Sequence, residues 1–426
     1  MKNLAELLSP GAGTVWLRVG TLLDGSRTAP VPDGHLVYSA TAILHAGAEA
    51  PPAAVLRPGQ TGPDAVLPRH TVLPGLIEAH AHLFLEGGEE NPVRRAEYLK
   101  QSDAELLARA TPRLAHLLAL GVVAVRDAGD RNGVGLALQA LTRAARPGES
   151  PYVDSPGAAI HHQGRYGSFM GRPVEEYPSI AACVDGRLAE GAYRIKLIAT
   201  GIINFEKGAV TAKPQMPAEE LAVFTAAAKA RGRQTFAHCS GHDGVAHCIA
   251  AGVDTIEHGF FVDAAQLAQM RDADIGWVPT LAPVQFQVDQ AEQLGWTPTV
   301  RDNLQRILDG HAASLVRAAE LGVRIIAGSD AGSHGVPHGR GLLWEMALME
   351  RAGLGALTVL HAATGASAAR LGFGEDFGRL RRGARPRFIL TESSPLATVT
   401  NLTCARTVVC DGAVFATGDQ AWPPGL

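Results

Sequence analysis

The 426-residue chain contains little cysteine, and its five cysteines are scattered along the sequence. Their number is odd and none of them forms a Cys-x-x-Cys pair, so the sequence indicates neither a disulfide framework nor a zinc ribbon. We therefore expect the protein to work in a reducing compartment.

Long apolar runs and blocks of like charge are also absent. No window approaches the roughly 20 apolar residues of a membrane helix, and the N-terminal run MKNLAELLSPGAG is too weakly apolar for a secretory signal. The net charge of −4, from 38 basic and 42 acidic residues, gives no footprint of a nucleic-acid-binding protein. We expect a cytoplasmic protein with a small-molecule substrate and no nucleic-acid or membrane partner. The sequence leaves open whether it forms a homo-oligomer.

Hydrophobic residues make up 46% of the chain, enough for a large core, and they follow two patterns. Residues 14–25 and 34–47, and again 387–393 and 405–416, have the composition of short strands. From residue 72 onward, short apolar runs alternate with longer helical stretches. That alternation is typical of repeated strand-helix units around a parallel sheet.

Eight apolar runs can be counted between the two β-rich ends. They cover residues 71–80, 121–129, 152–160, 193–200, 232–239, 252–259, 275–283 and 323–330. Helices are predicted where apolar residues recur at three- and four-residue spacing, over residues 96–120, 133–145, 218–230 and 300–321. Eight strand-helix units close a barrel.

The predicted fold class is therefore α/β, a (β/α)8 TIM barrel with a small β-sandwich-like domain built from both chain ends. Residues 1–70 and 385–426 are predicted to form the two parts of the small β-domain. Residues 71–384 are predicted to form the barrel.

In such a barrel, the side chains that carry chemistry lie at the C-terminal ends of the strands. These positions hold four histidines, a lysine and an aspartate: His80, His82, Lys196, His238, His258 and Asp330. Imidazole and carboxylate bind divalent metals, whereas an ammonium ion beside a metal would be repelled. A Lys196 carbamate, formed with carbon dioxide, would instead supply anionic oxygens that bridge two metals. The alternative is an unmodified, salt-bridged lysine.

Six short motifs extend this pattern: VLPGLIEAHAHL, KLIATG, FAHCSG, DTIEHG, AGSDAG and GVPHG. Together they resemble the amidohydrolase superfamily, in particular its imidazolonepropionase-like and prolidase-like (Xaa-Pro dipeptidase) branch with a carbamylated lysine. The resemblance covers nearly the whole chain.

The resemblance implies two divalent metal ions in a hydrolase barrel. His80 and His82 would bind the first with Asp330, His238 and His258 would bind the second, and carbamylated Lys196 would bridge them. Zinc is the expected metal, although manganese, cobalt and iron accept the same ligands.

The implied reaction is hydrolysis of an amide or peptide C–N bond, in a dipeptide or an N-acyl amino acid, by a metal-bridging hydroxide with Asp330 as proton shuttle. A cyclic amide, a carbamate or urea, or a lactone would suit the same site. Deamination is disfavoured, because residues 239–241 lack the glutamate that related deaminases carry after the strand-five histidine. A non-catalytic assembly protein is disfavoured because all six ligand positions are filled.

Two departures from the branch concern the substrate pocket. Loop 161–171 reads HHQGRYGSFMG where the branch usually has GGHG. His161, His162 or Arg165 is expected to replace the loop histidine that assists the oxyanion. Arg165 and Tyr166 are also candidates for binding a substrate carboxylate, since a guanidinium group suits bidentate pairing.

The second departure is Ser240, which stands where the branch commonly has a substrate-holding tyrosine. Ser240 is therefore a substrate-binding candidate. His338, in the GVPHG motif, is another, in a supporting rather than a metal-ligating position. Loops 201–216 and 280–298 are expected to form walls of the pocket.

Overall fold

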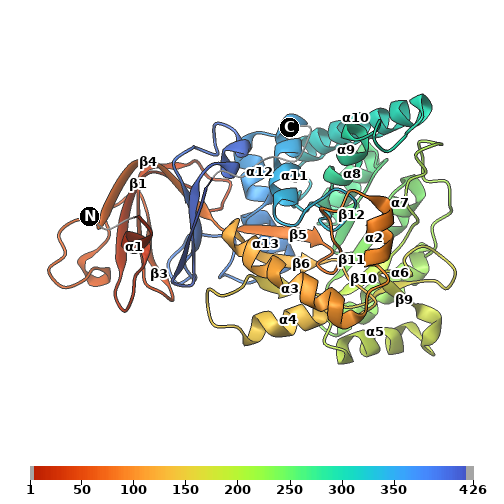
Figure 1. Cartoon of the computed structure of the whole chain (residues 1–426), viewed down its shortest axis with the longest axis horizontal. Coiled ribbons are helices and arrows are strands. Elements are labelled where there is room, and N and C mark those ends of the chain that lie inside the picture. Colours follow the sequence, from red (N-terminus) through yellow and green to blue (C-terminus); the bar gives the residue numbers. More distant parts are fainter. Residues whose placement is uncertain (1–3, 419–426) are drawn as a thin grey trace.

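The computed structural model describes residues 4–418. Its smaller part is a seven-stranded sheet, in the order β16-β15-β14-β4-β1-β2-β3, built from both ends of the chain (Figure 1). The strands are β1 (Val15–Leu22), β2 (Val31–Tyr38), β3 (Ile43–Gly47), β4 (Ala65–Pro74), β14 (Arg387–Thr391), β15 (Arg406–Cys410) and β16 (Ala413–Thr417). A short helix, α1 (Leu4–Leu8), precedes them.

This sheet folds over itself around one core. Tyr38 of β2 contacts Phe388 of β14 edge to face, with ring centroids 5.0 Å apart, although β1 and β4 lie between these strands in the sheet. Ile43 of β3 also donates a hydrogen bond to Ala384, just before β14. The β-sandwich-like arrangement predicted from the two β-rich ends is therefore present. β4 crosses the predicted boundary at residue 71, and the exact domain limits stay a prediction.

The larger part is the predicted (β/α)8 barrel. One parallel group has the order β5-β6-β7, and the other has the order β13-β12-β11-β10-β8-β9. The strands are β5 (Leu76–Ala81), β6 (Val122–Asp127), β7 (Tyr152–Asp154), β8 (Ala159–His161), β9 (Gly171–Pro173), β10 (Ile195–Ile198), β11 (Thr235–Cys239), β12 (Thr255–His258) and β13 (Gly276–Val278). The third predicted strand, 152–160, is interrupted between β7 and β8.

The eighth predicted strand, 323–330, closes the barrel without forming a continuous strand. It makes an isolated bridge to β13 at Ile325, and on its other side Asp330 donates its backbone N–H to the carbonyl of His80 on β5, at 2.8 Å. A Cβ on Gly328 would lie 2.8 Å from the His80 nitrogen, so this approach to β5 requires glycine. The segment ends at Asp330, whose φ is +56°, outside the range of an extended strand.

Helices surround the barrel strands (Figure 1). They are α2 (Pro92–Tyr98), α3 (Asp103–Ala119), α4 (Val134–Ala144), α5 (Ile180–Ala189), α6 (Ala218–Ala230), α7 (His242–Ala251), α8 (Ala264–Asp272), α9 (Ala282–Asp289), α10 (Pro298–Leu321), α11 (Arg340–Arg351), α12 (Ala356–Ala362) and α13 (Gly365–Leu371). Within the described residues there are also three short 3-10 helices, η1 (Ala53–Val55), η2 (Val174–Glu176) and η3 (Val399–Thr403).

Two helical predictions differ from the structure. The single helix predicted over 96–120 is two helices, because Ser102 caps a new helix and forms a capping box with Glu105. Loop 280–298 contains helix α9, whose first amides at Leu281 and Ala282 donate to the buried Glu345 carboxylate, at 2.9 and 2.8 Å. No local sequence pattern indicates this cap, because Glu345 lies on a separate helix. Across residues 4–418, no helix has the length and apolar character needed to cross a bilayer.

The contact between Tyr38 and Phe388 leads to a test of the joint core. Phe388 is fully buried, so Phe388→Ala should lower the free energy of unfolding by about 3–5 kcal/mol. Val66→Ala, at an exposed position on β4, should change it by less than about 0.5 kcal/mol. Urea unfolding followed by circular dichroism measures both. Equal, small effects would show that the chain ends do not share a core.

Candidate metal centre

The strand ends bring the six predicted ligands into one region of the barrel, and each of them is at most 9% exposed. They come from β5, β10, β11, β12 and the segment 323–330, and are His80, His82, Lys196, His238, His258 and Asp330. Such convergence at the C-terminal rim is where (β/α)8 enzymes place their chemistry.

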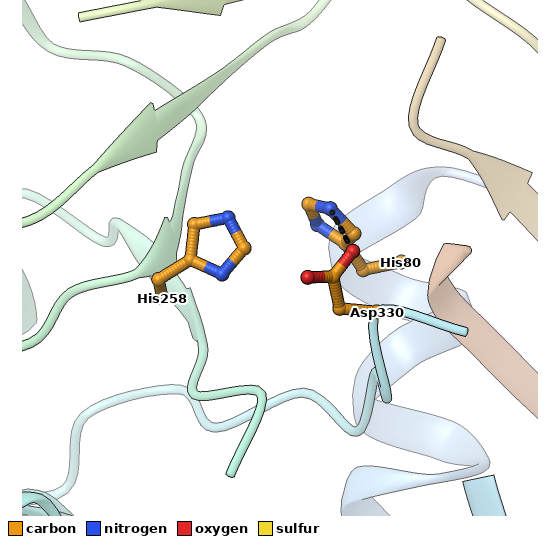
Figure 2. A group of neighbouring side chains, drawn as sticks. All are labelled: His80, His258 and Asp330. Atoms are coloured by element: carbon orange, nitrogen blue, oxygen red, sulfur yellow. Dashed lines mark ion pairs between the residues drawn. The ribbon is translucent and has the colours of Figure 1, made fainter. Parts of the chain in front are cut away.

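His80, His258 and Asp330 form the tightest group. One ligand atom from each lies within 4.8 Å of the other two, and Figure 2 shows the Asp330 carboxylate directed toward the His80 ring. Oδ1 of Asp330 is 3.5 Å from Nε2 of both His80 and His82, which is longer than a good hydrogen bond. His80 and Asp330 belong to the ligand set predicted for the first ion, and His258 belongs to the set predicted for the second. The two predicted ligand sets are therefore adjacent.

The histidines are held by partners on the side away from this group. Nδ1 of His80 is 2.6 Å from the Glu257 carboxylate, and Nδ1 of His82 donates to the carbonyl of Gly129 at 3.0 Å. Because these partners only accept, Nδ1 carries the proton and Nε2 keeps a free lone pair.

His258 is held in the same way. Its Nδ1 is 2.8 Å from Oγ1 of Thr280, and the Thr280 hydroxyl donates its own proton to the Pro279 carbonyl. The threonine oxygen therefore accepts from His258. The fourth histidine, His238, is hydrogen-bonded to the backbone of Gly201.

Burial sets the protonation of the imidazoles. Removal from water lowers the pKa of His82 and of His238 to about 3, and lowers the pKa of His80 and His258 well below the usual value. All four rings are therefore neutral at neutral pH, which is the form that binds metals.

The backbone at the site is strained. His258, Thr280 and Asp330 have φ values of +67°, +51° and +56°, a region that non-glycine residues rarely adopt. Each such residue costs on the order of 1–3 kcal/mol and persists where the surrounding structure enforces it. The strain occurs at two of the predicted ligands and at the residue that orients one of them.

Lys196 is buried beside the ring of Phe236, with its Nζ 4.6 Å from the ring centroid. Burial lowers the pKa of its amine to about 8, so the neutral amine is a larger fraction at neutral pH than in an ordinary lysine, although the protonated form still predominates. A neutral amine is the form that reacts with carbon dioxide.

The donor atoms fit divalent cations. Within residues 4–418, Nε2 of His80, Nε2 of His238, Nζ of Lys196 and Oδ1 of Asp330 are buried without a hydrogen-bond partner. A buried polar atom left unpaired costs about 1–3 kcal/mol. Four such atoms at one rim match the nitrogen and oxygen ligands that zinc and similar metals prefer.

A cavity of about 460 Å³ opens onto four of the six predicted ligands, His82, His238, His258 and Asp330. Much of its wall is apolar and comes from Leu85, Phe169, Met170, Ile202, Ile203, Phe205, Phe260, Pro283 and Val284. The polar lining residues are His82, Arg95, Tyr166, His238, Ser240, His258, Asp330, Ser333 and His334. The loops predicted as pocket walls, 201–216 and 280–298, both contribute. The volume and lining suit a small, largely apolar molecule.

The predicted substrate-binding residues fall into two groups. Tyr166 and Ser240 line the cavity, and the Tyr166 ring lies 5.3 Å from the His238 ring. Arg165 is exposed outside the cavity wall and donates to the carbonyl of Lys213. His338 lies behind the wall, where its Nε2 donates to the carbonyl of Leu85 at 2.9 Å.

The two predicted catalytic histidines of loop 161–171 also form hydrogen bonds outside the cavity. His161 is buried, and its Nδ1 donates to the carbonyl of His162 at 2.8 Å. His162 lies between two carboxylates, with Nδ1 2.7 Å from Glu175 and Nε2 2.9 Å from Glu220. Neither histidine is among the residues of the cavity wall.

Two residues of the site, Glu257 and Arg95, were not predicted from the sequence. Glu257 orients His80 and is itself paired with the buried Arg126 at 2.8 Å; the only sequence signal was its place beside His258 in DTIEHG. Arg95 lines the cavity from α2, in a stretch that reads as an ordinary charged helix. Only the tertiary structure brings either residue to the site.

A (β/α)8 barrel with imidazoles, a lysine and a carboxylate at one rim has the arrangement of a metal-dependent barrel hydrolase. The Amidohydrolase family model matches residues 71–414. The chain belongs to this family, and the protein is a hydrolase.

Similar proteins share part of the sequence or the fold. An uncharacterized protein of Mycobacterium tuberculosis (strain ATCC 25618 / H37Rv) is 27% identical over 303 residues, covering 71% of this chain and 75% of the relative. A solved Xaa-Pro dipeptidase with bound methionine shares the fold, with a TM-score of 0.79, 24% identity and coverage of 95% of this chain and 100% of that one. Aspergillus niger ochratoxinase has a TM-score of 0.76, 22% identity and 97% coverage of both chains.

The contact between Glu257 and His80 leads to a test of metal binding. Glu257→Gln keeps the shape but weakens the acceptor that orients His80, so the affinity for zinc should fall about 10- to 100-fold. Competition with a chromophoric chelator measures the affinity, and circular dichroism shows whether the fold is kept. The control is Glu320→Gln, at an exposed ion pair on α10, which should bind zinc normally. Unchanged affinity in folded Glu257→Gln protein would contradict an orienting role.

Proposed function

We propose that the protein is a binuclear metal-dependent hydrolase that cleaves the amide C–N bond of a dipeptide or an N-acyl amino acid. The observation that carries this proposal is the set of buried, unpartnered ligand atoms that meets an apolar cavity of about 460 Å³. The family, and the likeness to a structure named as an Xaa-Pro dipeptidase, support the choice of an amide over other bonds.

We keep the assignment of ligands that the resemblance to the family implies. His80, His82 and Asp330 would hold one ion, His238 and His258 the other, and Lys196, as a carbamate, would bridge them. Zinc is the proposed metal, because neutral imidazole and carboxylate are its preferred ligands here. When bound, the ions would acidify a water molecule and polarise the scissile carbonyl.

Asp330 is the proposed proton shuttle. Its Oδ1 faces Nε2 of His80 and of His82, where an ion would be held, so Oδ2, which also accepts a hydrogen bond from the Ser333 hydroxyl at 2.8 Å, would take a proton from the attacking water. As the carbon–nitrogen bond breaks, the same oxygen returns the proton to the leaving nitrogen. Burial raises the pKa of Asp330 to about 7, and a neighbouring cation would lower it, so the carboxylate form would accept the proton.

The cavity wall holds the substrate beside these groups. Tyr166 and Ser240 are the predicted substrate-binding residues that reach it. We assign the contact with the developing oxyanion to Tyr166, because His162 is already bound to two carboxylates. The apolar residues exclude water and favour an uncharged, bulky portion of the substrate.

The proposed reaction is tested with a panel of dipeptides and N-acyl amino acids, using protein loaded with zinc and bicarbonate. Hydrolysis should be seen and should disappear on chelation. Asp330→Asn should retain most of the metal yet lose about 10²- to 10⁴-fold in kcat, because the amide accepts no proton. Asp272→Asn, at an exposed site on α8, is the control. A metal-loaded enzyme that cleaves no member of the panel would refute the substrate class.

Lys196 distinguishes a bridged pair of metals from a single metal. Lys196→Ala and Lys196→Arg should both lose one metal equivalent, since neither side chain forms a carbamate. Acetate or propionate added to Lys196→Ala should restore some metal and turnover by occupying the vacated position. The control is Lys229→Ala, at an exposed position near the end of α6. Elemental analysis and activity are measured together, and normal metal content in Lys196→Arg would exclude the bridge.

A further inference from the structure

Arg95 places a guanidinium group in the wall of the cavity. It belongs to α2, and its Nη1 donates to the carbonyl of Glu86 at 2.8 Å while Nη2 donates to the carbonyl of Gly332 at 2.6 Å. Gly332 follows the proposed proton shuttle, Asp330, by two residues. The side chain is thus fixed next to the loop that carries the chemistry.

No carboxylate forms an ion pair with this guanidinium in the part of the chain from residue 4 to residue 418. The carboxylate of Glu86 pairs instead with Arg113 at 2.8 Å, and Asp330 faces the histidines. The two hydrogen bonds of Arg95 go to neutral carbonyls and use two of the five N–H donors of a guanidinium group. Donors therefore remain for an anion.

The neighbouring Arg94 shows the contrast. It is exposed, and it forms a two-point ion pair with Glu89 at 2.7 and 2.8 Å. Arg95 is half-buried instead, and burial lowers the pKa of its guanidinium. The carboxylates of Asp330 and Glu86 offset part of this effect from beyond ion-pair distance, and an anion bound in direct contact would offset more of the cost of burying the cation.

Arg95 also differs in charge from the rest of the wall. Among the lining residues it is the one with a permanent positive charge, and most of its neighbours in the wall are apolar or neutral. Arg165, the arginine expected from sequence to bind a carboxylate, donates to the Lys213 carbonyl outside the wall. Two-point pairing with a carboxylate is the interaction that guanidinium geometry suits best.

We propose that Arg95 binds the free carboxylate of the substrate, on the amino acid that leaves when the amide is cleaved. This inference rests on the proposed amide hydrolysis and deepens it. It makes the substrate class N-acyl amino acids or dipeptides with an intact C-terminal carboxylate. The apolar wall, including Phe169, Ile202 and Phe205, receives the remainder of the molecule.

The test uses two ligands of equal shape, N-acetyl-L-phenylalanine and its carboxamide. The wild-type enzyme should favour the carboxylate about 10- to 100-fold in kcat/KM, as expected for charge-assisted hydrogen bonds. Arg95→Gln should lose that preference through KM and leave the carboxamide within about threefold. Arg95→Lys should recover part of it, and the control Arg94→Gln should behave as the wild type.

Binding is measured in parallel by calorimetry on metal-loaded Asp330→Asn protein with the same two ligands. Carboxylate-selective binding that depends on Arg95, without hydrolysis in the wild type, would support this inference and refute the proposed reaction. Equal binding and equal turnover of both ligands would overturn the inference and leave amide hydrolysis intact. An equal loss for both ligands in Arg95→Gln, with a lower melting temperature, would show that Arg95 only ties α2 to Gly332 and would also overturn it.

Discussion

The packing of segment 323–330 against β5 is the constraint on which the site depends. The backbone amide of Asp330 donates to the carbonyl of His80, and the buried Glu78 carboxylate accepts from the amides of both His80 and Ser329 and from the Ser329 hydroxyl. These contacts close the barrel and fix the aspartate beside the histidines in one step. A site built on this seam is rigid because neither side can shift without leaving buried hydrogen-bonding groups unpaired.

The energetics of the rim follow from burial. Burial lowers the pKa of the four histidines, which keeps them neutral, and it also lowers the pKa of the Lys196 amine. Hydrogen bonds to Nδ1 orient the rings. The acceptors are the Gly129 carbonyl, the Thr280 hydroxyl and the Glu257 carboxylate, which is paired with Arg126. Among the six predicted ligands, the buried atoms without a hydrogen-bond partner are Nε2 of His80, Nε2 of His238, Nζ of Lys196 and Oδ1 of Asp330. Stability is given up where ligands are expected to bind, which is common at functional sites.

The fold class could be predicted because hydrophobic periodicity is a local property. The apolar runs marked the barrel strands and the β-rich ends marked the small domain. Two helix predictions were wrong because of helix caps. Ser102 begins a new helix inside the predicted helix 96–120, and Glu345, on a separate helix, caps α9 within a predicted loop. The segment at 323–330 departs from a strand because Gly328 must approach β5 closely.

By itself, the sequence determined which residues end the strands, since His80, His238, His258 and Asp330 follow apolar runs whose direction and period fix the rim on which they lie. The tertiary structure decided which side chains meet. Glu257 reaches His80 across 177 residues, Arg95 reaches the loop of Asp330 from α2, and loop 161–171 turns Tyr166 to the cavity but Arg165 away from it. Local patterns contain no information on such pairings, because they depend on how separate elements pack around the closed barrel.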